Sequence, residues 1–190
     1  MKVILIPGMK CTPIAESNWY SWFASEMRAR NLECPLLEYP DAHKCRESIW
    51  VPHVKSLITD INKTILVGHS SGAACCMRLL EQIEPLGTIL VAAAYTDFGD
   101  AGERESEYFN RPWDWDTIKK RRNVIMYHSR DDPLIPVVEA RYIKEKLGDG
   151  IDYREMKKMS HFFRKWDDIL TAVDDIVATS APAQAAPNDS

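Results

Sequence analysis

Short apolar runs alternate with longer amphipathic stretches along nearly the whole chain. Most of the short runs are bounded by Gly, Pro, Asn or Asp, as strands usually are, and the longer stretches repeat apolar residues at helical spacing. The predicted strands are residues 2–6, 34–39, 64–67, 88–93, 124–127 and 151–156, and the predicted helices are residues 19–30, 46–61, 72–83, 137–147 and 166–178.

This alternation predicts a three-layer α/β/α fold around a six-stranded, mainly parallel sheet, because parallel strands need helical crossovers. The length of 190 residues favours one domain, expected over residues 1–178. Residues 95–116 are rich in aromatic and acidic side chains and predict a short excursion over the sheet with little or no lid. Residues 179–190 have no large apolar side chain, so we expect a disordered tail.

Composition limits the kinds of partner. Hydrophobic residues make up 45% of the chain, charged residues 27%, and the net charge is −4 without a basic stripe, so neither nucleic acid nor a membrane is expected as a partner. The apolar run that begins at Val3 stops at Pro7, too short for a signal peptide, which favours a cytoplasmic location.

Five cysteines without Cys-x-x-Cys spacing predict free thiols that mostly fill the core, with neither disulfides nor a metal site. No organic cofactor is expected, and no glycine-rich nucleotide-binding pattern follows any strand.

The segment Gly68-His69-Ser70-Ser71-Gly72 follows a predicted strand and precedes a predicted helix. A Gly-x-Ser-x-Gly pattern in this setting is typical of a nucleophile elbow, a sharp turn that exposes the serine at the carboxyl end of a sheet. Side chains at either glycine would collide with neighbouring backbone. Ser70 is therefore the candidate nucleophile, and Gly68 and Gly72 are the elbow glycines.

A serine hydroxyl needs a base that is itself oriented by an acid. Downstream of Ser70 the histidines are His128 and His161, and His161 is the better candidate because it lies in the loop after the last predicted strand. The acid is expected after the preceding strand, where Asp132 stands directly before Pro133; Asp131 is the alternative.

An oxyanion hole requires two backbone N–H groups. In a nucleophile elbow one comes from the residue after the serine, here Ser71. The second is expected in the loop after the first strand, and we assign it to Met9.

Eight motifs lie between Ile6 and Phe162, and several of them, notably the Arg-Glu-Ser-Ile-Trp and Arg-Pro-Trp-x-Trp segments, are not general hydrolase features. The eight motifs are Ile6-Pro7-Gly8, Trp19-Tyr20-x-Trp22, Arg46-Glu47-Ser48-Ile49-Trp50, Gly68-His69-Ser70-Ser71-Gly72-Ala73, Ala94-Tyr95-Thr96, Tyr108-Phe109-x-Arg111-Pro112-Trp113-x-Trp115, Asp131-Asp132-Pro133 and His161-Phe162. In these the chain resembles the retinoblastoma-binding protein 9 family of small serine hydrolases. The resemblance implies a six-stranded parallel sheet, a triad of Ser70, Asp132 and His161, and a small-molecule acyl substrate such as an amino-acyl ester or an unblocked amino-terminal amide.

Two features depart from this family. Its glycine-rich loop reads Gly8-Met9-Lys10-Cys11-Thr12-Pro13 here, which bears on the oxyanion hole. The Leu-x-Cys-x-Glu motif is absent, so binding of the retinoblastoma protein is not predicted.

The excursion contains five acidic residues. They could attract an amine group of a substrate, or they could simply form a solvated face; they are Asp97, Asp100, Glu103, Glu105 and Glu107.

The sequence thus predicts a serine hydrolase that cleaves small carboxylic esters or amides through an acyl-enzyme on Ser70. The alternative is a binding or scaffold protein on a hydrolase fold with little catalytic turnover, since a fold does not establish a function. Activation of Ser70 distinguishes the two.

Overall fold

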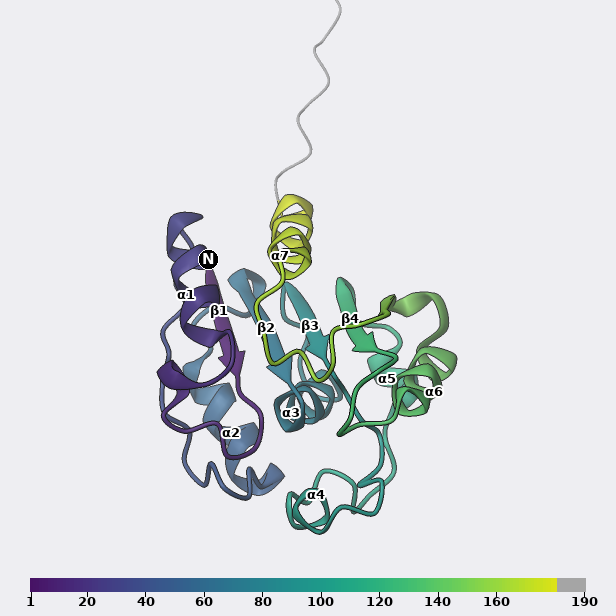
Figure 1. The fold of residues 1–190 in the computed structure, drawn as a ribbon. Coiled ribbons are helices and arrows are strands. Elements are labelled where there is room, and N and C mark those ends of the chain that lie inside the picture. The colour runs from purple at the N-terminus through teal and green to yellow at the C-terminus, as the bar shows by residue number, and fades with distance from the viewer. Residues whose placement is uncertain (181–190) are drawn as a thin grey trace, which may run out of the picture.

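The computed structural model describes residues 1–180, and five strands in this range form one sheet (Figure 1). The strands are β1 (Lys2–Ile6), β2 (Thr64–His69), β3 (Gly87–Val91), β4 (Val124–Ser129) and β5 (Asp152–Met156). Their order in the sheet is β1-β2-β3-β4-β5 and every neighbouring pair is parallel. All carboxyl ends therefore meet at one edge, and the arrowheads in Figure 1 point toward the side where the label α4 stands.

Helices connect and cover these strands at nearly the predicted positions. They are α1 (Tyr20–Ala29), α2 (Glu47–Leu57), α3 (Ser71–Leu80), α4 (Ala101–Glu105), α5 (Trp115–Ile118), α6 (Val137–Leu147) and α7 (Asp168–Thr179), with 3-10 turns at Ile14–Glu16, Ile61–Lys63 and Gly148–Gly150. The helix predicted over residues 46–61 is shorter than expected because Ile58 is extended and ends α2. The predicted α/β/α architecture is confirmed.

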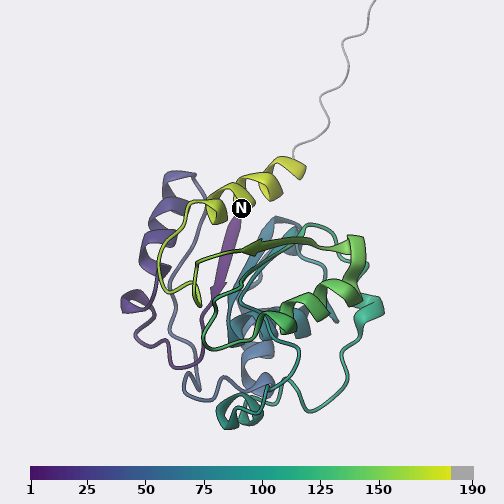
Figure 2. The same ribbon diagram turned by 45° about the vertical axis from the view of Figure 1, so that its right-hand side comes forward.

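Two apolar cores lie on opposite faces of the sheet, because successive side chains of a strand point to opposite faces. Ile65 and Val67 of β2 pack in one core with side chains of α1 and α7, whereas Leu66 packs in the other with side chains of α2, α3 and α6. In Figure 2, α6 (green) lies in front of the strands and α7 (yellow) lies across the top of the view.

The predicted strand at residues 34–39 was wrong, so the described sheet has five strands and not six. Next to this segment, the backbone pairs with β1 at an isolated bridge between Lys2 and Glu33, where the N–H of Val3 donates to Glu33 O at 2.7 Å. The next residue but one, Pro35, has no N–H to continue the ladder, and the segment turns away from the edge.

The excursion after β3 contains two short helices, α4 and α5, and is held by one buried cation. Arg78 of α3 has no exposed side-chain surface and lies 3.6 Å from the centre of the Trp113 ring. Its guanidinium donates to the backbone oxygens of Tyr108, Arg111 and Pro112. These bonds fix the later part of the excursion, from Tyr108 to Pro112, by its backbone against α3.

Helix α7 runs through Thr179 and so includes the first residue of the expected tail, while residues 181–190 lie outside the described part of the chain. No helix within residues 1–180 combines the length and apolar character needed to cross a membrane. All five cysteines are free; Cys34, Cys45, Cys75 and Cys76 are buried, as the core-filling interpretation predicted, and Cys11 is half-buried.

Candidate active site

Ser70 occupies a strained turn between β2 and α3. Its backbone angles are φ 56° and ψ −123°, a region that residues other than glycine rarely adopt. Its N–H donates to Val91 O of the neighbouring strand at 2.8 Å, which holds the turn at the carboxyl edge of the sheet. Helix α3 begins at the next residue, so the serine lies at a helix N-terminus.

The two elbow glycines allow this turn to form. A β-carbon on Gly68 would lie 2.4 Å from Gly72 O, and one on Gly72 would lie 2.2 Å from Ile6 O. Both positions face rigid backbone, so any side chain would push β2, α3 and the end of β1 apart. The collision expected from the motif is present at both glycines.

His161 and Asp132 form a hydrogen-bonded pair beside this turn. His161 Nδ1 lies 2.8 Å from Asp132 Oδ2, and both side chains are almost completely buried. Asp132 Oδ1 accepts backbone N–H bonds from Leu134 at 2.9 Å and Ile135 at 3.0 Å. Burial alone would raise the pKa of Asp132, but the bonds from His161 and these amides outweigh it and hold the pKa below its ordinary value. The carboxylate is therefore charged and fixed in orientation.

Asp131, the alternative acid, and His128, the alternative base, have other hydrogen-bond partners. Asp131 Oδ1 accepts the hydroxyl of Ser129 at 2.5 Å and the N–H of Ser160 at 2.9 Å, so this carboxylate supports the loop that carries His161. His128 is fully buried and its Nε2 lies 3.0 Å from Ile135 O. Burial lowers the pKa of His128, which keeps it neutral beneath the loop of Asp132.

Two backbone amides near Ser70 are free to bind an oxyanion. Within residues 1–180, the N–H groups of Ser71 and Met9 make no hydrogen bond. The loop of Met9 is nevertheless ordered, because the N–H of Lys10 donates to Ala42 O at 2.8 Å and that of Cys11 to Gly8 O at 3.2 Å.

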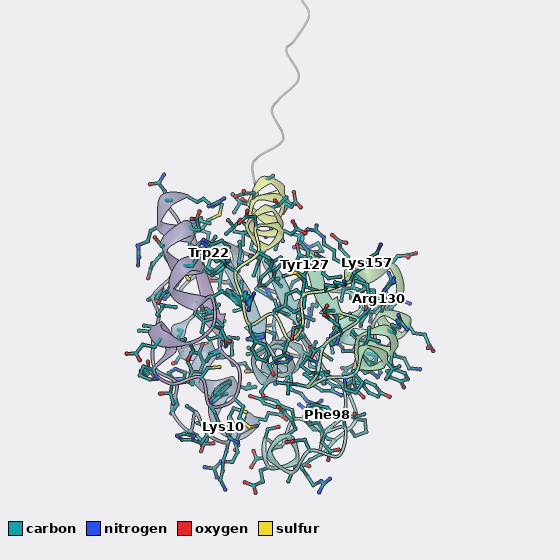
Figure 3. The ribbon with its side chains drawn as sticks, in the orientation of Figure 1. Lys10, Trp22, Phe98, Tyr127, Arg130 and Lys157 are labelled. Atoms are coloured by element: carbon teal, nitrogen blue, oxygen red, sulfur yellow. The ribbon has the colours of Figure 1, made fainter. Side chains whose placement is uncertain are left out.

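A pocket of about 260 Å³ opens above Ser70. Figure 3 places Lys10 and Phe98, which lie after β1 and β3, on the side toward which the strands run. The residues around the pocket are Gly8, Met9, Lys10, Cys11, Asn18, His69, Ser70, Phe98, Asp100, Glu103, Leu134, Ile135, His161 and Phe163. Ser70 and His161 thus face the same small cavity. No group of three or more His, Cys, Asp or Glu side chains in residues 1–180 is arranged to hold a metal ion.

Glu103 is a buried acid in the wall of this pocket, 8% exposed. Its Oε1 accepts the hydroxyl of Ser71 at 2.7 Å, and its N–H donates to Asp100 Oδ1 at 2.9 Å. Burial raises the pKa of the Glu103 carboxyl, and the bond from Ser71 only partly opposes this. Asp100 also lines the pocket, so two acidic side chains from neighbouring positions of the excursion contribute to its wall.

Comparisons with known proteins identify the family. A family model described as Serine hydrolase matches residues 3–175. The chain belongs to the serine hydrolase family. The serine hydrolase RBBP9 of Rattus norvegicus is 36% identical over 148 residues, which cover 77% of this chain and 80% of that protein. The resemblance seen in the motifs is thereby confirmed.

Solved structures show the same fold for this member of the serine hydrolase family. The product of the ydeN gene from B. subtilis superposes with a TM-score of 0.81 at 18% identity, covering 93% of this chain and 98% of that one. Alpha/beta hydrolase domain-containing protein 10 from mouse has a TM-score of 0.69 at 16% identity, covering 95% and 90%. The α/β-hydrolase fold is confirmed.

Two residues at this serine hydrolase site were missed from the sequence: His69, which lines the pocket, and Tyr20, whose hydroxyl lies 2.8 Å from His69 Nδ1. His69 stands at a variable position of the elbow motif and was not assigned a role. Its signal was the strand alternation, since Ile65 and Val67 point to the core beside α1 and His69 follows two positions later. Tyr20 is one residue of a core helix, and no spacing in the sequence connects it to the elbow.

Proposed function

We propose that this serine hydrolase cleaves small carboxylic esters or amides through an acyl-enzyme on Ser70. The observation that carries the proposal is the 2.8 Å contact between Asp132 and His161, whose imidazole faces the same pocket as a serine in a strained elbow. A histidine held by a buried carboxylate is the base that a serine nucleophile requires.

In the proposed reaction the Ser70 hydroxyl oxygen attacks the substrate carbonyl carbon while His161 Nε2 takes the hydroxyl proton. The negative oxygen of the tetrahedral intermediate accepts the N–H groups of Ser71 and Met9. The bond to the leaving group then breaks, and His161 returns the proton to the departing oxygen or nitrogen. Water repeats these steps on the acyl-enzyme and frees the acid, while Asp132 keeps the Nδ1 proton on His161 throughout.

The pocket supports a small acyl group that carries an amine. Its volume of about 260 Å³ suits a small substrate. Asp100 and Glu103 lie on one side, where they can attract the ammonium group of an amino-acyl ester or of an unblocked amino-terminal amide. Leu134 and Phe163 form an apolar rim next to His161, and their exposed fractions of 53% and 47% leave them free to contact a leaving group.

Labelling with a fluorophosphonate probe tests the nucleophile. Wild type and Ser70→Ala are treated with the probe and measured by intact mass. One adduct on wild type that is absent from Ser70→Ala supports the acyl-enzyme. Ser71→Ala is the matched control, because it removes a neighbouring hydroxyl and keeps the backbone amide, so it should still react. An unreactive wild type would favour the alternative of a catalytically weak binding or scaffold protein. The alternative is also consistent with the structure of residues 1–180, in which no hydrogen bond joins Ser70 and His161.

Paired substrates test the acyl class. Amino-acyl p-nitrophenyl esters with a free amine should be hydrolysed with a higher kcat/KM than their N-acetylated counterparts. Glu103→Gln should reduce this preference and leave kcat/KM for the acetylated substrate unchanged. Equal rates for both substrates in wild type would contradict amine recognition but leave the acyl-enzyme in place.

A further inference from the structure

A continuous chain of hydrogen bonds runs beneath the candidate active site. His69 is buried, with 1% of its surface exposed. Its Nε2 lies 2.9 Å from His161 O, and its Nδ1 lies 2.8 Å from the hydroxyl of Tyr20. The N–H of Gly8 donates to the same hydroxyl at 3.0 Å. Four segments that are distant in sequence thus share three bonds.

Only one arrangement of protons satisfies every member of this chain while the imidazole is neutral. A carbonyl oxygen can only accept, so Nε2 of His69 carries the proton and donates to His161 O. Nδ1 is then an acceptor, and the Tyr20 hydroxyl donates to it. The hydroxyl oxygen in turn accepts the N–H of Gly8. The direction of the chain is therefore from Gly8 to His161.

The environment of His69 keeps this arrangement at neutral pH. Burial, together with the neighbouring His161 ring at 5.0 Å between centroids, lowers the pKa of His69 to about 3, although the bond to His161 O and the charge of Asp132 favour the cation. Tyr20 also faces the ring, and burial raises its pKa well above the ordinary range, so the hydroxyl keeps its proton. His69 is consequently a neutral donor beside the base.

The loop of His161 needs such external support. Ser160 and Phe162, on either side of the histidine, have φ angles of 52° and 53°, which residues with a β-carbon rarely adopt. The N–H of Ser160 donates to Asp131 on one side. The carbonyl of His161 itself is held by His69. The position of the imidazole therefore depends on contacts from other segments.

We propose that His69 and Tyr20 are positioning residues that couple the loop of the base to the oxyanion loop. The chain holds the backbone of His161 at one end and Gly8, directly before the Met9 amide, at the other. A shift of either loop strains the buried hydrogen bond at its own end of the chain, and His69 and Tyr20 connect that end to the other loop. This inference rests on the proposed function, because the coupling affects catalysis only if His161 and Met9 act as described.

Two tyrosine variants test the coupling with a matched control. Tyr20→Phe removes the hydroxyl and keeps the ring, so it cuts the chain in the middle. Tyr39→Phe removes another buried hydroxyl, one that donates to Leu5 O at 3.0 Å outside the chain. Tyr20→Phe should lower kcat by about 10- to 100-fold with KM within about twofold, since small misplacement of reacting groups has effects of this size. Tyr39→Phe should destabilise the fold to a similar extent and leave kcat unchanged.

Variants of His69 separate hydrogen bonding from packing. His69→Gln supplies an amide N–H that can reach His161 O, whereas His69→Phe supplies an aromatic ring of similar shape and removes both hydrogen bonds. The glutamine variant should therefore retain more activity than the phenylalanine variant. If neither variant folds, ¹⁵N-histidine NMR of wild type gives the answer: His69 should show the Nε2–H tautomer unchanged from pH 5 to 8.

The outcomes separate the two proposals. A wild type that forms no fluorophosphonate adduct would overturn the proposed function. An active wild type in which Tyr20→Phe matches Tyr39→Phe in kcat, or in which His69 titrates within this pH range, would overturn the coupling alone. Loss of kcat in Tyr20→Phe together with the expected tautomer supports the coupling.

Discussion

The carboxylate of Glu103 accepts a hydrogen bond of 2.7 Å from the hydroxyl of Ser71, and so ties α4 to the first turn of α3. Ser71 also supplies the free backbone N–H next to the candidate nucleophile. The border of the pocket and the elbow are therefore joined at one residue. The bond brings a carboxylate into a buried position, and its protonation consequently affects stability.

Glu103→Gln is expected to raise stability at pH 7 to 8. Because burial raises the pKa of Glu103, the folded protein holds this proton more tightly than the unfolded chain, and stability falls as rising pH removes it. The amide has no charge to bury and can still accept the bond from Ser71. Melting temperatures between pH 4 and 8 should show an advantage of the variant that shrinks toward the acid end. Glu105→Gln, an exposed change in the same helix, should show no such trend; an equal trend would contradict the explanation.

Asp132→Asn is expected to lower kcat by roughly 10⁴-fold, because an amide favours the wrong tautomer of the histidine. Asp131→Asn is the control, since Asp131 supports the neighbouring Ser160 and does not touch the His161 ring. It should retain most of the activity in the same ester assay. A larger loss in Asp131→Asn than in Asp132→Asn would exchange the two assignments.

The depressed pKa of Asp132 also has an effect on acid stability. A carboxylate whose folded pKa lies below its unfolded value contributes stability that is complete above about pH 4 and is lost as pH falls through the folded pKa. Asp132→Asn should therefore be less stable than wild type at pH 6, with a difference that diminishes below about pH 4. Urea unfolding at both pH values measures it, and a deficit independent of pH would point to packing instead of charge.

Phe163→Ala is expected to reduce activity toward esters with aromatic leaving groups. The ring lies at the pocket mouth, 5.4 Å between centroids from His161, where the leaving group departs in the proposed reaction. Loss of this apolar contact should lower kcat/KM for naphthyl esters by about 10-fold, equivalent to roughly 1.4 kcal/mol. Methyl esters of the same acid should be nearly unaffected. Val138→Ala, also an exposed apolar residue but outside the pocket, serves as the control.

The architecture could be predicted because its signal is local. Each core strand and each long helix has its own apolar period, and residues 137–147 form a helix with the predicted bounds. The run at residues 34–39 has strand-like composition, but its pairing depends on whether an edge position is available. Pro35 interrupts the ladder there, and Leu37 remains 39% exposed. Composition alone could not decide between an edge strand and an extended loop.

The candidate site likewise contains residues that local sequence patterns predict and residues that only long-range contacts bring into place. Ser70, Asp132 and His161 follow strands in the order that the chemistry requires, so the topology brings them to one edge. Glu103 was one of five acids in a segment without strand or helix signal, and nothing local distinguished it from the others. Its contact with Ser71 joins positions 32 residues apart in the chain. Such long-range contacts have no counterpart in residue spacing.

Helix α7 covers the same core face as α1, although all five strands precede it in the chain. A β-carbon on Gly87 would meet the Ile176 side chain at 2.6 Å, so this helix lies directly against β3. During synthesis, β3 and β4 therefore leave the ribosome with one apolar face uncovered, and they stay so until the residues of α7 have followed. A nascent chain interrupted before residue 168 would present Ile89, Val91 and Ile125 to chaperones or to other nascent chains.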